Sequence, residues 1–506
     1  MTKLSILLLA AMCVAGAATR KPKLVVAIVV DQFRYDYLTR YRAEYTAGLN
    51  RLLTEGAVFT NANYAHVPTI TAVGHSTVLT GATPSISGIV ANDWYDRDEA
   101  APVSSVSDAG TQLLGGSGAG SSPHRLLVST IGDELKIADG GESRVIGISL
   151  KDRAAILPSG HMADGAFWLD VKSGNFASST YYYQELPVWA KEFNQQRPAD
   201  RYSGAKWLNH TLPVDSAKLY AGLAATPFGN ELIEAFAERA LAGEHLGTRE
   251  FTDLLTVSFS SNDYVGHSFG PDSPEARETA LGTDRLLGKL LDAVERQVGA
   301  GNFLVVFTAD HGVSPVPAVN TARKMPGGRI DPKDMRATVQ AALTAKYGAG
   351  EWVSGNWELA VYLNQVLIAQ KKLDLGAVQR TAADALQALP HVSRVYTLQQ
   401  MTDGGGVDDP ITHKVANGYH MRRGPDVELI PDPYWVVGPG TSGTGHATPY
   451  SYDTHVPVIF LGAGIRRGRY NMSILVNDIA PTLATLLDIE TPSGSIGRVL
   501  TEMLVD

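Results

Sequence analysis

The sequence contains a single cysteine, Cys13, among 506 residues. It lies close to the N-terminus, so the rest of the chain can form no disulfide and offers no thiolate to a metal ion or a substrate. Beyond this N-terminal stretch, no apolar run approaches the length of about 20 residues that a membrane-spanning helix requires. Any catalytic or metal chemistry must therefore use oxygen and nitrogen groups.

An excess of basic residues is also missing. The formal net charge is -9, which argues against a nucleic-acid partner, because proteins that bind nucleic acids carry a basic face. A local positive pocket for a small anion is compatible with this charge. Hydrophobic residues make up 44% of the chain and charged residues 19%, which excludes disorder and supports a large core. One large α/β domain with insertions fits the length as well as two or three domains do.

The N-terminal stretch MTKLSILLLAAMCVAGAATRK has the three parts of a secretory signal peptide. Lys3 provides the positive start, residues 4–14 the apolar core and residues 15–17 (AGA) the small-residue cleavage site. The alternative, a membrane anchor, requires a longer apolar run. We therefore predict a signal peptide over residues 1–17. The mature protein, residues 18–506, is then periplasmic or secreted, free of the membrane after cleavage, and a monomer.

Short apolar runs rich in β-branched residues recur along the chain, as is typical of strands buried on both faces of a sheet. They cover residues 24–30, 144–150, 254–260, 303–308 and 456–461. Helical patterns lie between them, such as residues 126–138 and 274–298. This alternation predicts an α/β fold with a mainly parallel central sheet and helices on both faces.

Two less regular regions interrupt this pattern, at about residues 160–247 and 313–440. In the second, Asp331 and Pro332 have the preferences of an N-cap and a first helical residue, which predicts a helix to Tyr347. We predict that both regions are cap insertions over the functional site. For the first region, ordinary packing against the core is an equal alternative.

Six His and Asp side chains form a candidate metal centre, and most of them follow predicted strands, where open α/β sheets place their sites. They are Asp31, Asp263, His267, Asp310, His311 and His446. Nitrogen and carboxylate ligands without thiolate suit catalytic zinc, with manganese as the alternative. Each alone could be a helix cap or a structural histidine, but together they predict a metal site. His455 is a rival for His446; it lies one residue before an apolar run, so we predict that it is not a ligand.

A candidate nucleophile, Thr71, lies between a loop and a predicted helix, because Pro68 disfavours helix at the residue before it. Free backbone N–H groups and the positive end of a helix favour an anion at such a junction. This environment suits a hydroxyl that attacks a phosphate. The alternative is that Thr71 only caps the helix.

Asp31, Thr71, the D-x-x-x-H pair, the D-H pair and a late His together resemble the alkaline phosphatase superfamily of two-zinc phosphoryl-transfer enzymes. The frame T-x-x-x-H-x-x-x-x-T-G-x-x-P-x-x-x-G-I-x-x-N from Thr71 to Asn92 is similar to its threonine-nucleophile branch. That branch includes nucleotide pyrophosphatase/phosphodiesterases and PafA- and PhoK-like alkaline phosphatases. The segment SLKDRAAILPSGH, residues 149–161, resembles the phosphatase subgroup. The resemblance covers nearly the whole chain after the signal peptide.

The resemblance implies two zinc ions per chain and assigns their ligands. Asp263, His267 and His446 match the first zinc site, and Asp31, Asp310, His311 and Thr71 match the second. Thr71 would form a phosphothreonine intermediate, and Asn92 would donate to a phosphate oxygen. The spacing of Thr71 from His75 and Asn92 favours it over Thr69. Ala447 follows the late His, where many relatives have glycine.

Lys151 and Arg153 indicate the class of substrate. They are two residues apart after a strand, so an extended backbone would place them on one side, where two cations can hold the outer oxygens of a phosphate monoester dianion. The alternative is a surface pair. We predict a broad-specificity alkaline phosphatase that releases inorganic phosphate from small-molecule monoesters. The alternatives are a phosphodiesterase or nucleotide pyrophosphatase, whose substrate has one more oxygen esterified, and a non-catalytic binding protein, which would need no nucleophile.

Overall fold

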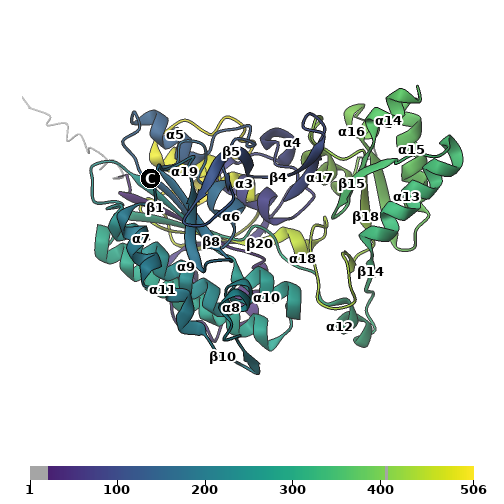
Figure 1. The fold of residues 1–506 in the computed structure, drawn as a ribbon. Helices are drawn as coiled ribbons and strands as arrows, with labels where there is room; N and C mark the ends of the chain where they lie inside the picture. The colour runs from purple at the N-terminus through teal and green to yellow at the C-terminus, as the bar shows by residue number, and fades with distance from the viewer. Residues whose placement is uncertain (1–20, 405–407, 506) are drawn as a thin grey trace, which may run out of the picture.

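The computed structural model describes residues 21–404 and 408–505, so the predicted signal peptide lies outside the described residues. Within this part of the chain, no helix has both the length and the apolar character needed to cross a membrane. Figure 1 shows a large body built on one sheet and, at its right, a smaller lobe with a sheet of its own.

The main sheet has eleven strands. In spatial order they are β21 (Gly468–Leu475), β2 (Ala57–Asn63), β20 (His455–Gly462), β13 (Phe303–Thr308), β1 (Leu24–Val30), β12 (Asp253–Phe259), β7 (Val145–Ile148), β8 (Gly165–Asp170), β9 (Asn175–Ser179), β5 (Ser107–Leu114) and β6 (Ala119–Ser121). The five central strands, from β13 to β8, run parallel, whereas β20 and β9 pair antiparallel to the strands beside them. The predicted α/β fold is confirmed, with its parallel part at the centre of the sheet.

The central strands are buried along their whole length, as their apolar runs predict. In register, Leu24 of β1 lies between Asp253 of β12 and Phe303 of β13, so these three strands end together at one edge of the sheet. The predicted bounds of β1 and β13 match those of the structure. β7 is shorter than predicted, because the chain turns into the helix α6 (Asp152–Ile156), for which Lys151 is the N-cap.

Helices cover both faces of the main sheet (Figure 1). On one side α2 (Gly48–Glu55) and α9 (Pro227–Gly243) pack against α11 (Pro274–Val298); on the other, α3 (Thr71–Thr80) and α5 (Ile131–Ala138) pack against α19 (Ile479–Leu487). The site helix α10 (Ser261–Phe269) follows β12 almost directly. Helix α11 begins where Ser273 accepts a hydrogen bond from Ala276 N and ends at Gly299, whose φ of 84° no longer fits a helix.

The smaller lobe comes from the second predicted insertion. Its sheet has the order β15 (Val353–Trp357), β16 (Ala360–Leu363), β18 (Val427–Pro431) and β17 (Val392–Thr397). Helices α13 (Pro332–Tyr347) and α15 (Leu375–Gln387) pack on it around a core of its own that includes Trp352. Asp331 caps α13 as predicted, accepting a hydrogen bond from Lys333 N.

The first predicted insertion, residues 160–247, has a different place in the structure. Its strands β8 and β9 extend the main sheet, and its helix α7 (Val188–Gln195) packs against α9 and β9. Phe167 and Phe176, from these two strands, stack around Phe236 of α9. These aromatic residues therefore pack on the main body.

Candidate metal centre

The predicted ligands meet at the carboxyl edge of the central strands. Asp31 follows β1 directly, and the Asp310–His311 pair follows β13. Asp263 and His267 lie one turn apart on α10, and His446 comes from the loop that precedes β20. Because the parallel strands end at a common edge, residues more than 400 positions apart in the chain become neighbours.

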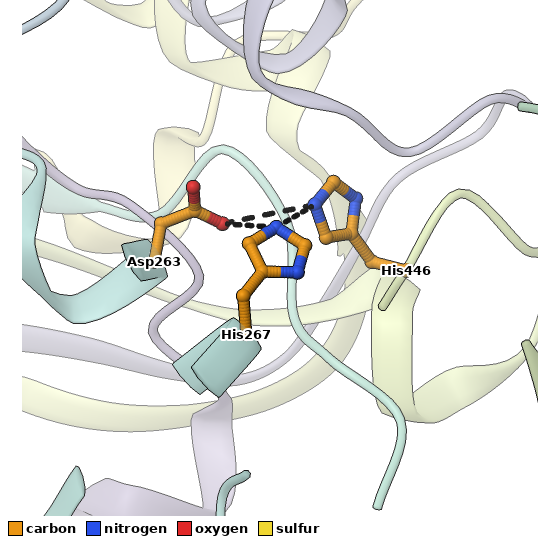
Figure 2. A group of neighbouring side chains, drawn as sticks. All are labelled: Asp263, His267 and His446. Carbon is orange, nitrogen blue, oxygen red and sulfur yellow. Dashed lines mark hydrogen bonds and ion pairs between the residues drawn. The ribbon is translucent and has the colours of Figure 1, made fainter. Parts of the chain in front are cut away.

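The first cluster consists of Asp263, His267 and His446 (Figure 2). Asp263 Oδ1 lies 3.2 Å from His267 Nε2 and 3.7 Å from His446 Nε2, and the two Nε2 atoms are 3.2 Å apart. The Nδ1 atoms of His267 and His446 face the backbone carbonyls of Thr444 and Thr69, at 2.9 and 2.7 Å. A carbonyl only accepts, so both Nδ1 atoms carry the proton.

Two neutral rings with protonated Nδ1 atoms would direct both Nε2 lone pairs at each other and at a carboxylate oxygen. A proton or a metal cation must therefore lie among these three atoms. Burial, together with His311 and His267, holds the pKa of His446 well below its usual value, so the His446 ring is neutral, as a metal ligand must be. A backbone carbonyl that fixes the other ring nitrogen is the arrangement usual for metal-binding histidines.

The second cluster contains Asp31, Asp310 and His311, all fully buried. Asp310 Oδ2 lies 3.2 Å from His311 Nε2, and His311 Nδ1 donates to Gly312 O at 2.9 Å. Two of these atoms, Asp310 Oδ2 and His311 Nε2, are buried and form no hydrogen bond among the described residues. Buried polar atoms are rarely left without a partner, so this donor set fits a cation such as zinc.

His75 lies next to the second cluster, but its contacts differ from those of the ligands. Its ring comes within 3.4 Å of both Asp31 and Asp310. Its Nδ1 donates to Thr71 O at 2.9 Å, however, and its Nε2 bonds to Ser258 Oγ at 2.8 Å. Asp31, His75 and Asp310 are thus the side chains that the structure brings close enough to share a cation. Because both nitrogens of His75 are engaged, His311 stays the predicted ligand. The i, i+4 spacing of Thr71 and His75 was a signal for this contact in the sequence.

Thr71 is the first residue of α3, and Ile70 is the N-cap with an extended backbone. The side chain of Asn92 accepts a hydrogen bond from Ala72 N at 2.9 Å. This contact fixes Asn92 Oδ1 at the start of the helix, so its Nδ2 is available to a ligand. The rival Thr69 donates its hydroxyl to Thr448 O at 3.0 Å. The Thr69 hydroxyl is therefore occupied, and Thr71 stays the predicted nucleophile.

A cavity of about 320 Å³ opens over this site. Its lining includes Asn92, His267 and His446 from the main body, and Arg329 and Glu358 from the side of the smaller lobe. The second predicted insertion thus contributes one wall of the cavity.

His455, the rival of His446, lies elsewhere. Its ring stacks on Tyr35 with a centroid separation of 4.4 Å, and its Nε2 bonds to Thr60 O at 3.0 Å.

Lys151 lies between the two clusters. Its Nζ is 2.9 Å from Asp31 Oδ2 and 2.7 Å from Asp263 Oδ2. Although burial opposes the charge, these two carboxylates raise the pKa of Lys151 above its usual value. The ammonium group is therefore charged and ties the clusters together.

The extended backbone predicted for Lys151 and Arg153 is wrong, because a helix begins between them; their role in binding phosphate stays a prediction. Asp152 begins the helix α6, with its side chain accepting a hydrogen bond from Arg153 N at 2.7 Å. The Arg153 side chain is 28% exposed, whereas that of Lys151 is 3% exposed. Arg153 is therefore partly open to solvent, whereas Lys151 is enclosed.

The profile of the type I phosphodiesterase / nucleotide pyrophosphatase family matches residues 25–455. The chain is 37% identical to alkaline phosphatase PafA of Elizabethkingia meningoseptica, over 96% of this chain and 95% of that protein. The chain belongs to the PafA-like alkaline phosphatases. It is also 38% identical to alkaline phosphatase PhoV of Synechococcus elongatus, over 96% of this chain and 93% of the other.

The solved structures agree with this family. The crystal structure of wild-type PafA has a TM-score of 0.91 and covers 96% of this chain and 100% of that one. A PafA mutant in which a threonine, an asparagine, a lysine and an arginine are replaced has a TM-score of 0.90. Murine ectonucleotide pyrophosphatase / phosphodiesterase 5, at 15% identity and a TM-score of 0.57 or less, shares the fold.

Proposed function

We propose that this PafA-like alkaline phosphatase is an exported, zinc-dependent enzyme that hydrolyses phosphate monoesters of broad structure through a phosphothreonine at Thr71. The observation that carries the proposal is two groups of close side chains beside α3, tied together by Lys151: Asp263, His267 and His446, and Asp31, His75 and Asp310. A non-catalytic binding protein would not need a hydroxyl at that position.

In this proposal each cluster holds one zinc ion. The first is held by Asp263, His267 and His446, and the second by Asp31, Asp310 and His311 with the Thr71 hydroxyl. Bound zinc supplies positive charge that lowers the pKa of a coordinated hydroxyl and stabilises a transferring phosphoryl group.

The residues of the chain position the reactants. The Thr71 hydroxyl, once deprotonated, attacks phosphorus, the ester oxygen leaves with its electron pair, and water later cleaves the phosphothreonine. Free N–H groups at the start of α3 and the Asn92 amide would hold phosphate oxygens. The hydrogen bond from Ala72 N to Asn92 Oδ1 fixes this amide before substrate arrives, which favours the transition state.

Lys151 and Arg153 support a monoester as the substrate, because a dianion gains more from two cations than a diester monoanion does. In the PafA mutant of known structure, the replaced threonine and asparagine are 21 positions apart and the replaced lysine and arginine two positions apart. Thr71 and Asn92, and Lys151 and Arg153, have the same spacings here. A diester is the second candidate, because the matching family profile is that of phosphodiesterases.

The test compares an aryl phosphate with the matching bis-aryl diester. We expect a much higher kcat/KM for the monoester, loss of activity with a strong chelator, and recovery when zinc is added. Thr71→Ala should lower turnover by several orders of magnitude, whereas Thr71→Ser should retain more because it keeps the hydroxyl. Preference for the diester would replace this proposal with the phosphodiesterase, and full activity of metal-stripped protein would refute the metal sites.

We further propose that residues 1–17 are removed as a signal peptide and that the mature protein is a periplasmic or secreted monomer. In the same proposal, the second insertion acts as a cap that bounds the space for the leaving group. Mass spectrometry of the mature N-terminus, together with light scattering, tests export and oligomeric state.

A further inference from the structure

Gln32 has an unusual backbone conformation for a buried residue. It follows Asp31 at the end of β1, is 2% exposed, and has a φ of 60°. Among the described residues, only two buried positions other than glycine have a positive φ, and the second is Ala447, next to His446. Such strained residues persist where the surrounding structure requires them, most often at functional sites. Both of these adjoin predicted metal ligands.

The contacts of Gln32 reach both clusters. Its backbone N–H donates to Asp310 Oδ1 at 2.9 Å, and its side-chain Nε2 donates to Asp263 Oδ1 at 2.7 Å. The orientation of the amide follows from chemistry, because a carboxylate can only accept. One residue thus holds a carboxylate from each cluster, and the residue before it, Asp31, is itself in the second cluster.

Helix α10 is shaped to receive this side chain. A Cβ atom at Gly266, the residue before His267, would overlap Gln32 Oε1. That oxygen is buried and has no hydrogen-bond partner in the described part of the chain. The amide is therefore held by its single bond to Asp263 and by the close approach of the Gly266 backbone.

Asp263 is held by two donors with different effects. Lys151 Nζ pairs with Oδ2, whereas the neutral Gln32 amide bonds to Oδ1, the oxygen that faces His267 and His446. A neutral donor orients this oxygen without adding a positive charge that would oppose a metal ion. Hydrogen-bond partners of metal-binding carboxylates commonly affect metal affinity by 10- to 100-fold.

We propose that Gln32 is a positioning residue that sets the separation of the two metal sites by holding Asp263 and Asp310 at once. This inference rests on the two-metal function proposed above. The left-handed backbone is needed because it turns the N–H toward Asp310 while the side chain reaches Asp263.

The test uses Gln32→Met, which keeps the length of the side chain but removes the amide donor. Zinc affinity is measured by competition with a chromogenic chelator, and the metal–metal separation by X-ray absorption. We expect the first zinc to bind about 10- to 100-fold more weakly and the separation to change. Saturating zinc should restore occupancy without restoring kcat. Gly266→Ala, which pushes on the same amide from α10, should have the same effect.

The matched control is Gln379→Met in the smaller lobe, where a buried glutamine donates to Asp426 Oδ1 at 2.9 Å. It should lower stability without changing zinc affinity. If Gln32→Met does not fold, the zinc affinity and metal–metal separation of Gly266→Ala test the inference. The inference is overturned if both site variants bind two zinc ions with the affinity and separation of the unchanged protein. If the unchanged protein itself binds no zinc and cleaves no monoester, the proposed function fails instead.

Discussion

Lys151 is expected both to bind the substrate phosphate and to link the two clusters. Its position after β7 does not by itself indicate the second task. Its ammonium group lies within 3 Å of a carboxylate from each cluster, so it offsets part of the negative charge that Asp31 and Asp263 bring into a buried site. Arg153 has no comparable contact among the described residues, where its one ion pair, with Asp152, is 4.0 Å long. The two cations are therefore expected to act differently on the reaction.

Single substitutions should separate these roles. Arg153→Ala removes a partly exposed cation that we propose binds the phosphate, so we expect kcat/KM for a monoester to fall by about one to two decades, the equivalent of a charge-assisted contact of about 1.5–3 kcal/mol. Hydrolysis of the diester should change little. Lys151→Ala also disturbs the carboxylates, so both substrates should lose activity and zinc should bind more weakly. Steady-state kinetics on both substrates, with zinc titrations, check this. Equal losses on both substrates in Arg153→Ala would contradict its role in substrate choice.

At the residue scale, the sequence predicts which polar side chains gather, because strand ends in a parallel sheet meet at one edge. Asp263, His267 and His446 lie together in the structure, and their role as metal ligands stays a prediction. The task of Gln32 was not predictable, because it depends on a left-handed backbone. The spacing of Thr71 and His75 indicated their contact, but not the direction of the His75 ring nitrogens. The sequence did not predict the helix that begins at Asp152, because the segment after β7 is too short and polar to show a helical periodicity.

At the scale of elements, α3 must approach the end of β13 very closely for Thr71 to reach the second cluster. A Cβ atom at Gly74, on α3, would overlap the backbone carbonyl of Asp310. A glycine within a helix lowers stability relative to alanine. At Gly74 this loss accompanies a close contact between the backbone of α3 and that of Asp310. The five apolar runs predicted their strands well, whereas the antiparallel flanks were not evident, since apolar content does not encode strand direction.

Gly74→Ala should force α3 away from Asp310. We expect a loss of about 1–3 kcal/mol in the free energy of unfolding and more than a tenfold fall in kcat/KM, because the nucleophile and the second cluster separate. The control is Gly222→Ala on α8 (Ser216–Leu223), where a Cβ atom would meet nothing within 4 Å. That variant should keep full activity and gain up to about 1 kcal/mol. Denaturant unfolding and steady-state kinetics of both variants test this prediction. Unchanged activity in Gly74→Ala would contradict the need for close contact between α3 and Asp310.

On the scale of the whole molecule, the site concentrates charge that the fold alone does not neutralise. Three buried carboxylates, from Asp31, Asp263 and Asp310, lie beside one lysine and four histidines at the carboxyl edge of the central strands. In the metal-free protein, protons on these groups must take the place of the metal charge. The stability of the molecule should therefore depend on pH in different ways with and without zinc.

The pKa of His311 gives the direction in which the stability of the metal-free protein changes with pH. Although burial opposes it, the adjacent Asp310 carboxylate raises the pKa of His311 to about 9 in the metal-free protein, above the value of about 6.5 for an unfolded chain. A raised pKa gives stability that is fully present below about pH 6.5 and is lost as pH rises through about 9. With zinc bound, Nε2 has no proton to lose, so this loss should be absent. Zinc also stabilises the folded state by mass action, by about 2.7 kcal/mol per site at 100 times Kd.

The difference in Tm between zinc-loaded and metal-free protein should therefore widen from pH 6.5 to pH 9. Buried carboxyls such as Glu428, whose pKa burial raises to about 8, titrate in both forms, so their contribution cancels in the difference. Calorimetric scans at pH 6.5, 8 and 9, with zinc or with a chelator, measure it. Metal-free His311→Ala should lose less stability over this range than the metal-free parent, because it lacks the proton in question. A constant difference in Tm across the range would mean that zinc does not replace the His311 proton.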